Sequence, residues 1–321
     1  MTRIFVHEAS GCREADAVDP AWLQPGAGTT FWVDLAAPTP EDGQLLSQVF
    51  HFHELAVEDA MSAIHHPKIE SYDAYLYLIL HGIDLRGGAE GFATHDIDFF
   101  LGPNYLVTVH DGHSRSIAEQ YTVCLRNTNA IGEGSGALLH RIIDAMVDHY
   151  RPEIERLEAR VDELEACVFE QPNQNPIREL IQVKKDLASL RRVTLPQRDA
   201  VARLARREFS QITEPITWRM RDVYDHLVRL SEESGVLHDR VASLIDAFLS
   251  AQSNRLNQVM KLMTVIATIF MPLTVLTGMF GMNVTLPRLP GGEAAQFWWI
   301  SGLMTIVIAV MLWMFRRNRW I

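Results

Sequence analysis

Two long stretches without a charged residue, both near the C-terminus, restrict the fold more than any other feature of the sequence. Leu262 to Phe280 and Phe297 to Phe315 are each 19 uncharged, mostly apolar residues. A helix of that length spans about 30 Å, the hydrocarbon thickness of a bilayer. Buried helices of a soluble core are the alternative interpretation, which this length disfavours. The two stretches therefore predict two C-terminal transmembrane helices.

The distribution of charge predicts the orientation of these helices. Basic residues flank the pair on its outer sides, at Arg255, Lys261, Arg316, Arg317 and Arg319. The segment between the helices carries only Arg288 and Glu293. Residues 1–10 lack the basic and apolar segments of a signal peptide. We therefore expect a multi-pass protein of the inner (plasma) membrane with both termini in the cytoplasm.

The remainder of the chain is acidic. The net charge is −11, although residues 256–321 hold five basic residues and one acidic residue. An acidic domain repels nucleic acid and attracts cations, although solubility alone also explains the charge. Three scattered cysteines offer no thiolate metal site. We find no nucleotide-binding loop and no nucleophile motif, so we expect neither an enzyme nor an organic cofactor.

Residues 1–130 are predicted to form a cytosolic α/β domain. Helical patterns cover residues 40–50 and 54–62, while glycines and a proline mark the turns. Runs of β-branched and aromatic residues predict strands at residues 2–8, 30–36, 74–83, 95–101 and 105–110.

Long helices follow, which makes the expected fold class α+β. A stalk is predicted over residues 131–255, with helices at 137–169 and 175–208. A third helix over residues 214–280 would contain 67 residues and extend roughly 100 Å. A helix of that length needs partner helices, which indicates an oligomer. The C-terminal part divides into a pore-lining span, an outer loop, and a second span with a basic tail, at residues 256–283, 284–296 and 297–321.

One face of the first span is suited to lining a water-filled path. Spacings of three and four residues place six side chains on that face: Asn257, Met260, Met263, Ala267, Met271 and Thr274. We call this set the α-helical stripe. Several copies around an axis are needed to enclose a path. Ordinary helix packing in lipid, which also favours small residues and methionine, explains the spacing equally well.

The sequence around the stripe resembles the CorA family of magnesium transporters. Residues 259–274 read VMKLMTVIATIFMPLT, which is similar to the first transmembrane segment of that family. Gly281-Met282-Asn283 follows and matches the family's Gly-Met-Asn signature. Residues 221–226, Arg-Asp-Val-Tyr-Asp-His, are similar to its stalk motif. The resemblance extends from about residue 30 to the C-terminus.

The resemblance implies a funnel-shaped homopentamer in which the long helix lines the pore. Gly281, Met282 and Asn283 are then expected to form the selectivity filter, with a ring of Asn283 amide oxygens at the outer mouth. Neutral acceptors suit a hydrated Mg²⁺ ion, which sheds water reluctantly, whereas carboxylates would hold the ion too tightly. Asn257 would form a second polar ring. A dewetting constriction is expected between the rings, at Met260, Met263 and Met271.

The resemblance also implies influx of Mg²⁺, with Co²⁺ and Ni²⁺ as further substrates, and closure by intracellular Mg²⁺ bound between neighbouring subunits. Asp222 in the stalk motif and Asp73 are the candidate ligands of this regulatory metal. Carboxylates that face one another repel when the ion leaves, which would favour opening. The alternative is that both are solvated surface acids.

Two departures from the family pattern concern the identity of the ion. Phe280 stands where the family usually has tyrosine, and Arg288 lies where an acidic residue is expected. The outer loop and basic tail are similar to the ZntB branch, which is associated with zinc. A zinc transporter of the same fold, with or without proton coupling, is therefore the second hypothesis. A membrane-tethered signalling protein is the third, disfavoured because only residues 284–296 would face outward.

Overall fold

The computed structural model of the chain describes residues 1–9, 11–24, 26–62, 66–84, 93–127, 129–170, 175–282, 292–318 and 320. The described chain divides into two compact units, Met1–Ile245 and Asp246–Ile321. The unit boundary falls within α7 (Glu214–Phe280), so each unit contains part of that helix.

A seven-stranded sheet forms the centre of the first unit, with the strand order β2-β1-β3-β7-β6-β5-β4. Only the β3–β7 pair is parallel among the described pairs. All six residues of β7 are buried, which agrees with its central position and its Tyr-Leu-Val-Thr-Val-His sequence. The strands are β1 (Thr2–Glu8), β2 (Gly11–Ala15), β3 (Thr30–Ala36), β4 (Lys68–Ser71), β5 (Leu76–Asp84), β6 (Ala93–Leu101) and β7 (Tyr105–His110).

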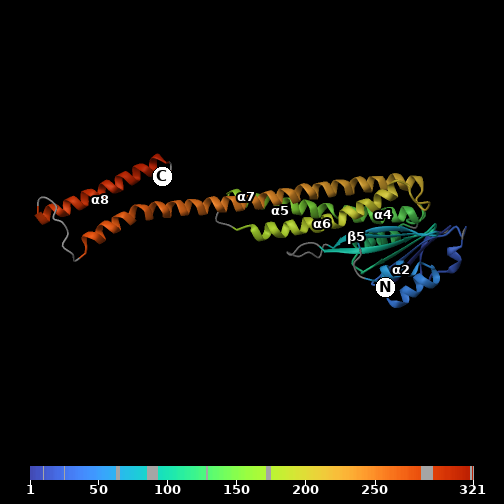
Figure 1. Cartoon of the computed structure of the whole chain (residues 1–321). Helices are drawn as coiled ribbons and strands as arrows, with labels where there is room; N and C mark the ends of the chain where they lie inside the picture. Colours follow the sequence, from blue (N-terminus) through green and yellow to red (C-terminus); the bar gives the residue numbers. More distant parts are fainter. Residues whose placement is uncertain are drawn as a thin grey trace. The chain divides into compact units, whose positions relative to one another are not determined.

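Helices cover both faces of this sheet (Figure 1). One face carries the smaller of two hydrophobic cores and is covered by α1 (Pro40–Gln44), the π-helical turn η2 (Leu45–Val49) and α2 (Glu54–Met61). The other face carries the larger core, which continues between the long helices. Those helices are α3 (Arg115–Arg126), α4 (Ser135–Asp148), α5 (Arg151–Glu170), α6 (Ile177–Ala205) and the first part of α7. A short 3₁₀ helix, η1 (Pro20–Leu23), follows β2.

The expected fold class is confirmed, and the five predicted strands are present with their ends shifted by at most two residues. The sequence did not reveal β2, β4 or α3. The predicted helix over residues 137–169 is wrong as a single element, because α4 ends at Asp148 and α5 begins at Arg151. Pro152 has no N–H group to donate to the carbonyl of Asp148, so the helix is interrupted there.

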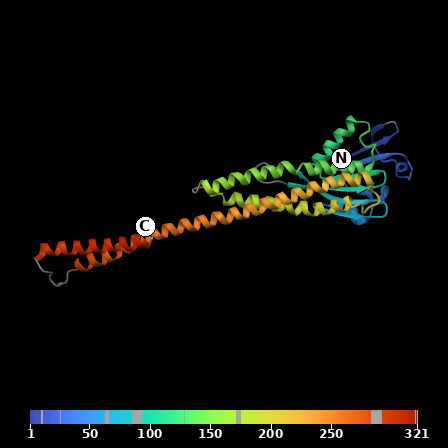
Figure 2. The same ribbon diagram turned by 90° about the horizontal axis from the view of Figure 1, so that it is seen from above.

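The long helices α5, α6 and the first part of α7 lie side by side in two perpendicular views (Figure 2). Their contact is apolar, through residues such as Leu157, Leu187 and Val241, each at most 1% exposed. Arg240 of α7 adds ion pairs to Asp162 and Glu165 of α5. The stalk therefore has a packed core of its own within one protomer.

The second unit contains the last part of α7 and α8 (Gly292–Arg317). Both helices contain a segment long and apolar enough to cross a membrane. Threonine hydroxyls in this part of α7 donate to carbonyls of the preceding turn, as from Thr268 to Thr264 and from Thr274 to Phe270. These bonds satisfy the hydroxyls inside an apolar helix.

One buried polar contact joins the sheet to the helices. The described pairing of β4 with β5 runs from Leu76 to Ile79 and ends before His81. The His81 N–H donates to Gln197 Oε1 of α6 at 2.8 Å, and its carbonyl accepts from the Tyr150 hydroxyl at 2.7 Å. Gln197 is fully buried. One side chain from α6 and one from the turn between α4 and α5 thus complete the hydrogen bonds of the strand.

We expect Gln197→Leu to lower the free energy of unfolding by about 1–3 kcal/mol, because it leaves the buried N–H of His81 without an acceptor. Gln182→Leu is the matched control, since Gln182 is exposed on the same helix and surface changes of this kind alter stability by about 0.5 kcal/mol or less. Denaturant unfolding of the full-length protein compares the two variants. Equal stability of both would contradict the role of Gln197.

Candidate ion pathway and metal site

The α-helical stripe lies on exposed surface of α7 within one protomer. All six of its residues are exposed, with Met260 at 65% and Met271 at 68%. By contrast, Val265 and Leu273 of the same helix segment are 6% and 9% exposed. The protomer therefore uses a different face of α7 for its own packing, and the stripe remains available for other contacts.

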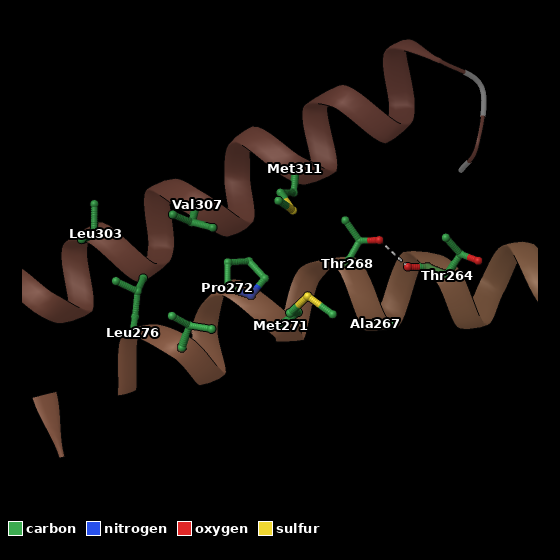
Figure 3. Close-up of a pocket in the computed structure, with 10 residues that line it drawn as sticks. Thr264, Ala267, Thr268, Met271, Pro272, Leu276, Leu303, Val307 and Met311 are labelled. Atoms are coloured by element: carbon green, nitrogen blue, oxygen red, sulfur yellow. Dashed lines mark hydrogen bonds between the residues drawn. The ribbon is translucent and has the colours of Figure 1, made fainter. Parts of the chain in front are cut away.

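Two stripe residues also border a crevice between α7 and α8 (Figure 3). The crevice has a volume of about 820 Å³ and an almost wholly apolar lining, to which Ala267 and Met271 contribute. Pro272 of α7 and Val307 of α8 point into it from opposite helices. The other four stripe residues do not line this crevice. Their assignment to a pore stays a prediction.

The described part of the expected selectivity filter is the turn that ends α7. Phe280 is the last helical residue, and the Gly281 N–H donates to the Thr277 carbonyl at 2.9 Å. A Cβ atom at Gly281 would lie 3.1 Å from that oxygen, which is tighter than an ordinary contact. Met282 is 58% exposed. Asn283 and the outer-loop residue Arg288 lie outside the described residues.

The stalk residue Asp222 belongs to an acidic cluster between α4 and α7. It lines a hollow of about 480 Å³ together with His140 and Asp144, and two arginines, Arg141 and Arg219, line the same hollow. Next to this hollow, Asp144, Asp148 and His226 offer ligand atoms that all lie within 4.8 Å of one another. Asp144 and Asp148 on α4 are spaced four residues apart, as are Asp222 and His226 on α7, so each pair shares one helix face.

The carboxyl group of Asp144 is the member of this cluster that would gain most directly from a bound cation. Burial, followed by the negative charges of Asp148 and Asp222, raises the pKa of Asp144 above its ordinary value, while His140 and His226 oppose the shift. Burial lowers the pKa of His140. Carboxylates suit Mg²⁺, and an imidazole nitrogen adds a ligand that Zn²⁺, Co²⁺ and Ni²⁺ accept. Asp144, Asp148 and His226 therefore offer ligands that a divalent ion accepts, whereas Arg141 and Arg219 make the adjoining hollow at Asp222 less favourable for a cation.

Asp73 lies elsewhere in the first unit. It is exposed in the turn between β4 and β5, where it borders a hollow of about 1050 Å³ with His51 and Asn104. This hollow shares no lining residue with the one at Asp222. One chain therefore does not bring the two predicted regulatory ligands together. A metal held by both, from neighbouring chains, stays a prediction.

Asp144, Asp148 and His226 were not recognised as candidate ligands from the sequence. The signal was available as Asp-x-x-x-Asp at residues 144–148 and Asp-x-x-x-His at residues 222–226. Each spacing places two ligands on one helical face. What the sequence does not contain is that α4 and α7, about 80 residues apart in the chain, turn these faces toward the same site.

Comparisons with known proteins identify the family. A family model described as the CorA-like Mg²⁺ transporter protein matches residues 27–317. The cobalt/magnesium transport protein CorA of Thermotoga maritima is 27% identical over 303 residues, which cover 92% of this chain and 84% of that protein. The zinc transport protein ZntB of Yersinia pestis is 27% identical over 291 residues, which cover 90% and 88% of the two chains.

A solved structure shares the fold. The complete structure of the CorA magnesium transporter from Methanocaldococcus jannaschii matches with a TM-score of 0.83 at 20% identity, covering 100% of this chain and 99% of that chain. The match includes the α/β domain, the long helix and the two apolar C-terminal helices. Since the family model also spans nearly the whole sequence, the chain belongs to the CorA family, whose members are membrane transporters of divalent metal ions and not enzymes.

Proposed function

We propose that the protein is a homopentameric channel for Mg²⁺ influx, with Co²⁺ and Ni²⁺ as further substrates. The observation that carries this proposal is the exposed α-helical stripe, which leads along α7 to Gly281-Met282-Asn283. Five copies of the stripe around an axis would enclose a path that one protomer cannot form. The lipid bilayer, the divalent ion and further copies of the chain are the partners in this proposal.

The membrane potential supplies the driving force. A divalent cation gains about 4.6 kcal/mol for each 100 mV of inside-negative potential, twice the value for a single charge. Both termini would lie in the cytoplasm of a cell whose inner (plasma) membrane contains the channel. The positive residues that flank the two apolar helices support this orientation.

Each part of the pathway has a physical role. The Asn283 amide oxygens would bind the hydrated ion at the mouth without the tight hold of carboxylates. Asn257 would offer a second polar ring at the cytoplasmic end. Between them, the methionines of the stripe would form a hydrophobic constriction that blocks ions when it contains no water.

Intracellular Mg²⁺ would close the channel by binding at the stalk. Asp222 remains the predicted ligand, and the position of Asp144, Asp148 and His226 beside it extends the proposed set. Loss of the ion would leave carboxylates facing one another, and their repulsion would favour the open state. Asp73 of a neighbouring subunit is retained as a proposed further ligand.

Zinc transport is the second candidate function. It is supported by the ZntB relative and by Arg288, a positive residue near the proposed outer mouth. A positive charge there lowers the local concentration of cations. Coupling to a proton gradient would compensate for this weaker attraction.

The proposal predicts uptake of Mg²⁺ into liposomes that contain the purified protein, increasing as the interior is made more negative. Parallel measurements use Co²⁺, Ni²⁺ and Zn²⁺, each with and without a pH gradient, and protein-free liposomes as the control. Uptake of Zn²⁺ that requires an inward proton gradient, without uptake of Mg²⁺, would favour the zinc hypothesis instead.

Asn283→Ala is expected to reduce Mg²⁺ uptake by about tenfold or more, a loss of about 1.4 kcal/mol or more in ion stabilisation, because it removes the ring of amide oxygens. Native mass spectrometry should give a five-chain particle for both variant and wild type. Asn318→Ala, at the end of α8, controls for general effects of losing an asparagine. Normal uptake by an assembled Asn283→Ala pentamer would exclude the proposed filter.

Asp222→Asn and Asp144→Asn are each expected to raise the internal Mg²⁺ concentration needed for half-closure by roughly fivefold or more, the lower end of typical coupling between sites. Maximal flux should be unchanged, since neither residue lies on the proposed pathway. Asp225→Asn is the matched control, because Asp225 is exposed on the same turn of α7 but does not belong to the cluster. The measurement is a flux titration against internal Mg²⁺. Superimposable curves for all variants would identify Asp222 and Asp144 as solvated surface charges.

A further inference from the structure

One carboxyl group that is not among the proposed metal ligands is buried inside the first unit. Asp98 lies on β6 between Ile79 of β5 and Val109 of β7, and it is only 4% exposed. It faces the smaller core, whose other members are apolar and aromatic side chains such as Tyr77 and Phe100. An ionised carboxylate in such a place is costly unless several donors surround it.

The hydrogen bonding around Asp98 is sparse for a carboxylate. Within the part of the chain that the structure describes, the Tyr77 hydroxyl is its hydrogen-bond partner. Lys68 of β4 lies over the Tyr77 ring with its Nζ 5.4 Å from the ring centroid. Lys68 already binds Asp59 Oδ2 at 2.6 Å and Glu70 Oε1 at 2.9 Å. Its charge is therefore largely used by other carboxylates.

Three further acidic groups lie near Asp98 or its partner Tyr77. Asp96 lies on the same strand, Asp59 comes from α2, and Glu70 from β4 lies near Tyr77. The neighbouring strand β7 presents Val109, and η2 contributes apolar residues. The surroundings therefore favour the neutral acid over the carboxylate.

We infer that Asp98 is a proton-binding switch of the first unit. Its protonated form holds α2 and the edge strand β4 against the rest of the sheet, and its ionised form loosens this corner as the pH rises. The ionised group would repel Asp59, which is joined through Lys68 to β4. The contact of α2 with the sheet is therefore the one that the charge would disturb. This inference goes beyond the proposed transport and does not depend on it.

The titration of Asp98 falls in a useful range. Burial is the largest cause and raises its pKa from 3.8 to about 7; Asp96 and Asp59 add to the shift, while Tyr77 and Lys68 oppose it. Because the folded pKa lies above the ordinary value, the native state binds more protons between about pH 4 and pH 7. Stability contributed by this proton is lost as the pH rises through that interval, and it does not change further above it.

The test is hydrogen exchange of the full-length protein in nanodiscs, read by mass spectrometry on the peptide that contains α2. We expect the protection of wild type relative to Asp98→Asn to fall between pH 5 and pH 7, with a slope approaching tenfold per pH unit, the limit for one proton. Above about pH 7 the ratio should level off. The α2 sequence is the same in both proteins, so the intrinsic exchange rates cancel.

Two further variants keep the inference open to refutation if Asp98→Asn folds poorly. Tyr77→Phe removes the hydrogen bond that favours the carboxylate, so the fall in protection of α2 should move to higher pH. Asp96→Asn removes a repelling charge, so the fall in protection should move to lower pH. Asp111→Asn, exposed after β7, should leave the profile unchanged. A wild-type profile parallel to Asp98→Asn, or midpoints that do not move in these directions, would overturn the inference.

Discussion

Every backbone N–H and C=O group between Leu262 and Phe280 must find a partner within its own helix if this segment lies in hydrocarbon. The backbone hydrogen bonds of α7 meet that requirement except at Pro272, which has no N–H to donate to the carbonyl of Thr268. The threonine hydroxyls of the segment bond to carbonyls of the preceding turn. The same requirement forces any polar function out of the backbone and onto side chains. This is why the expected ion pathway is a row of side chains on one helix face, and why the chain leaves the helix only where Gly281 ends it.

The elements that could be predicted are those whose signal is local. A strand such as β7 is a continuous run of buried β-branched and aromatic residues, and α7 starts at Glu214 as its N-terminal signal predicts. The edge strands β2 and β4 read Gly-Cys-Arg-Glu-Ala and Lys-Ile-Glu-Ser, and only their pairing with β1 and β5 makes them strands. Helix α3 depends on the cap that Ser114 gives to the Ile117 N–H, and that cap was overlooked.

The residues of the candidate site also differ in whether a local sequence signal predicts them. The stripe on α7 follows from spacing alone, since six residues of one helix share a face whatever the fold around them. The cluster at Asp144 and His226 depends instead on two helices meeting, and no residue pattern states where they meet. The environment of Asp98 also depends on tertiary contacts that the local sequence does not predict. Its neighbours in sequence resemble an ordinary half-polar strand, and only the covering by α2 makes its charge costly.

The completion of β5 by Gln197 also has a consequence for synthesis on the ribosome. The two hydrogen-bonded residues, His81 and Gln197, are 116 positions apart. Until α6 has left the exit tunnel, the backbone of β5 at His81 lacks the acceptor that Gln197 provides, although all seven strands have already been synthesised. This part of β5 is then an exposed strand edge. Open edges of this kind pair readily with other chains. Nascent chains should therefore be most prone to associate wrongly, and most in need of a chaperone, during the interval between the emergence of the sheet and that of residue 197.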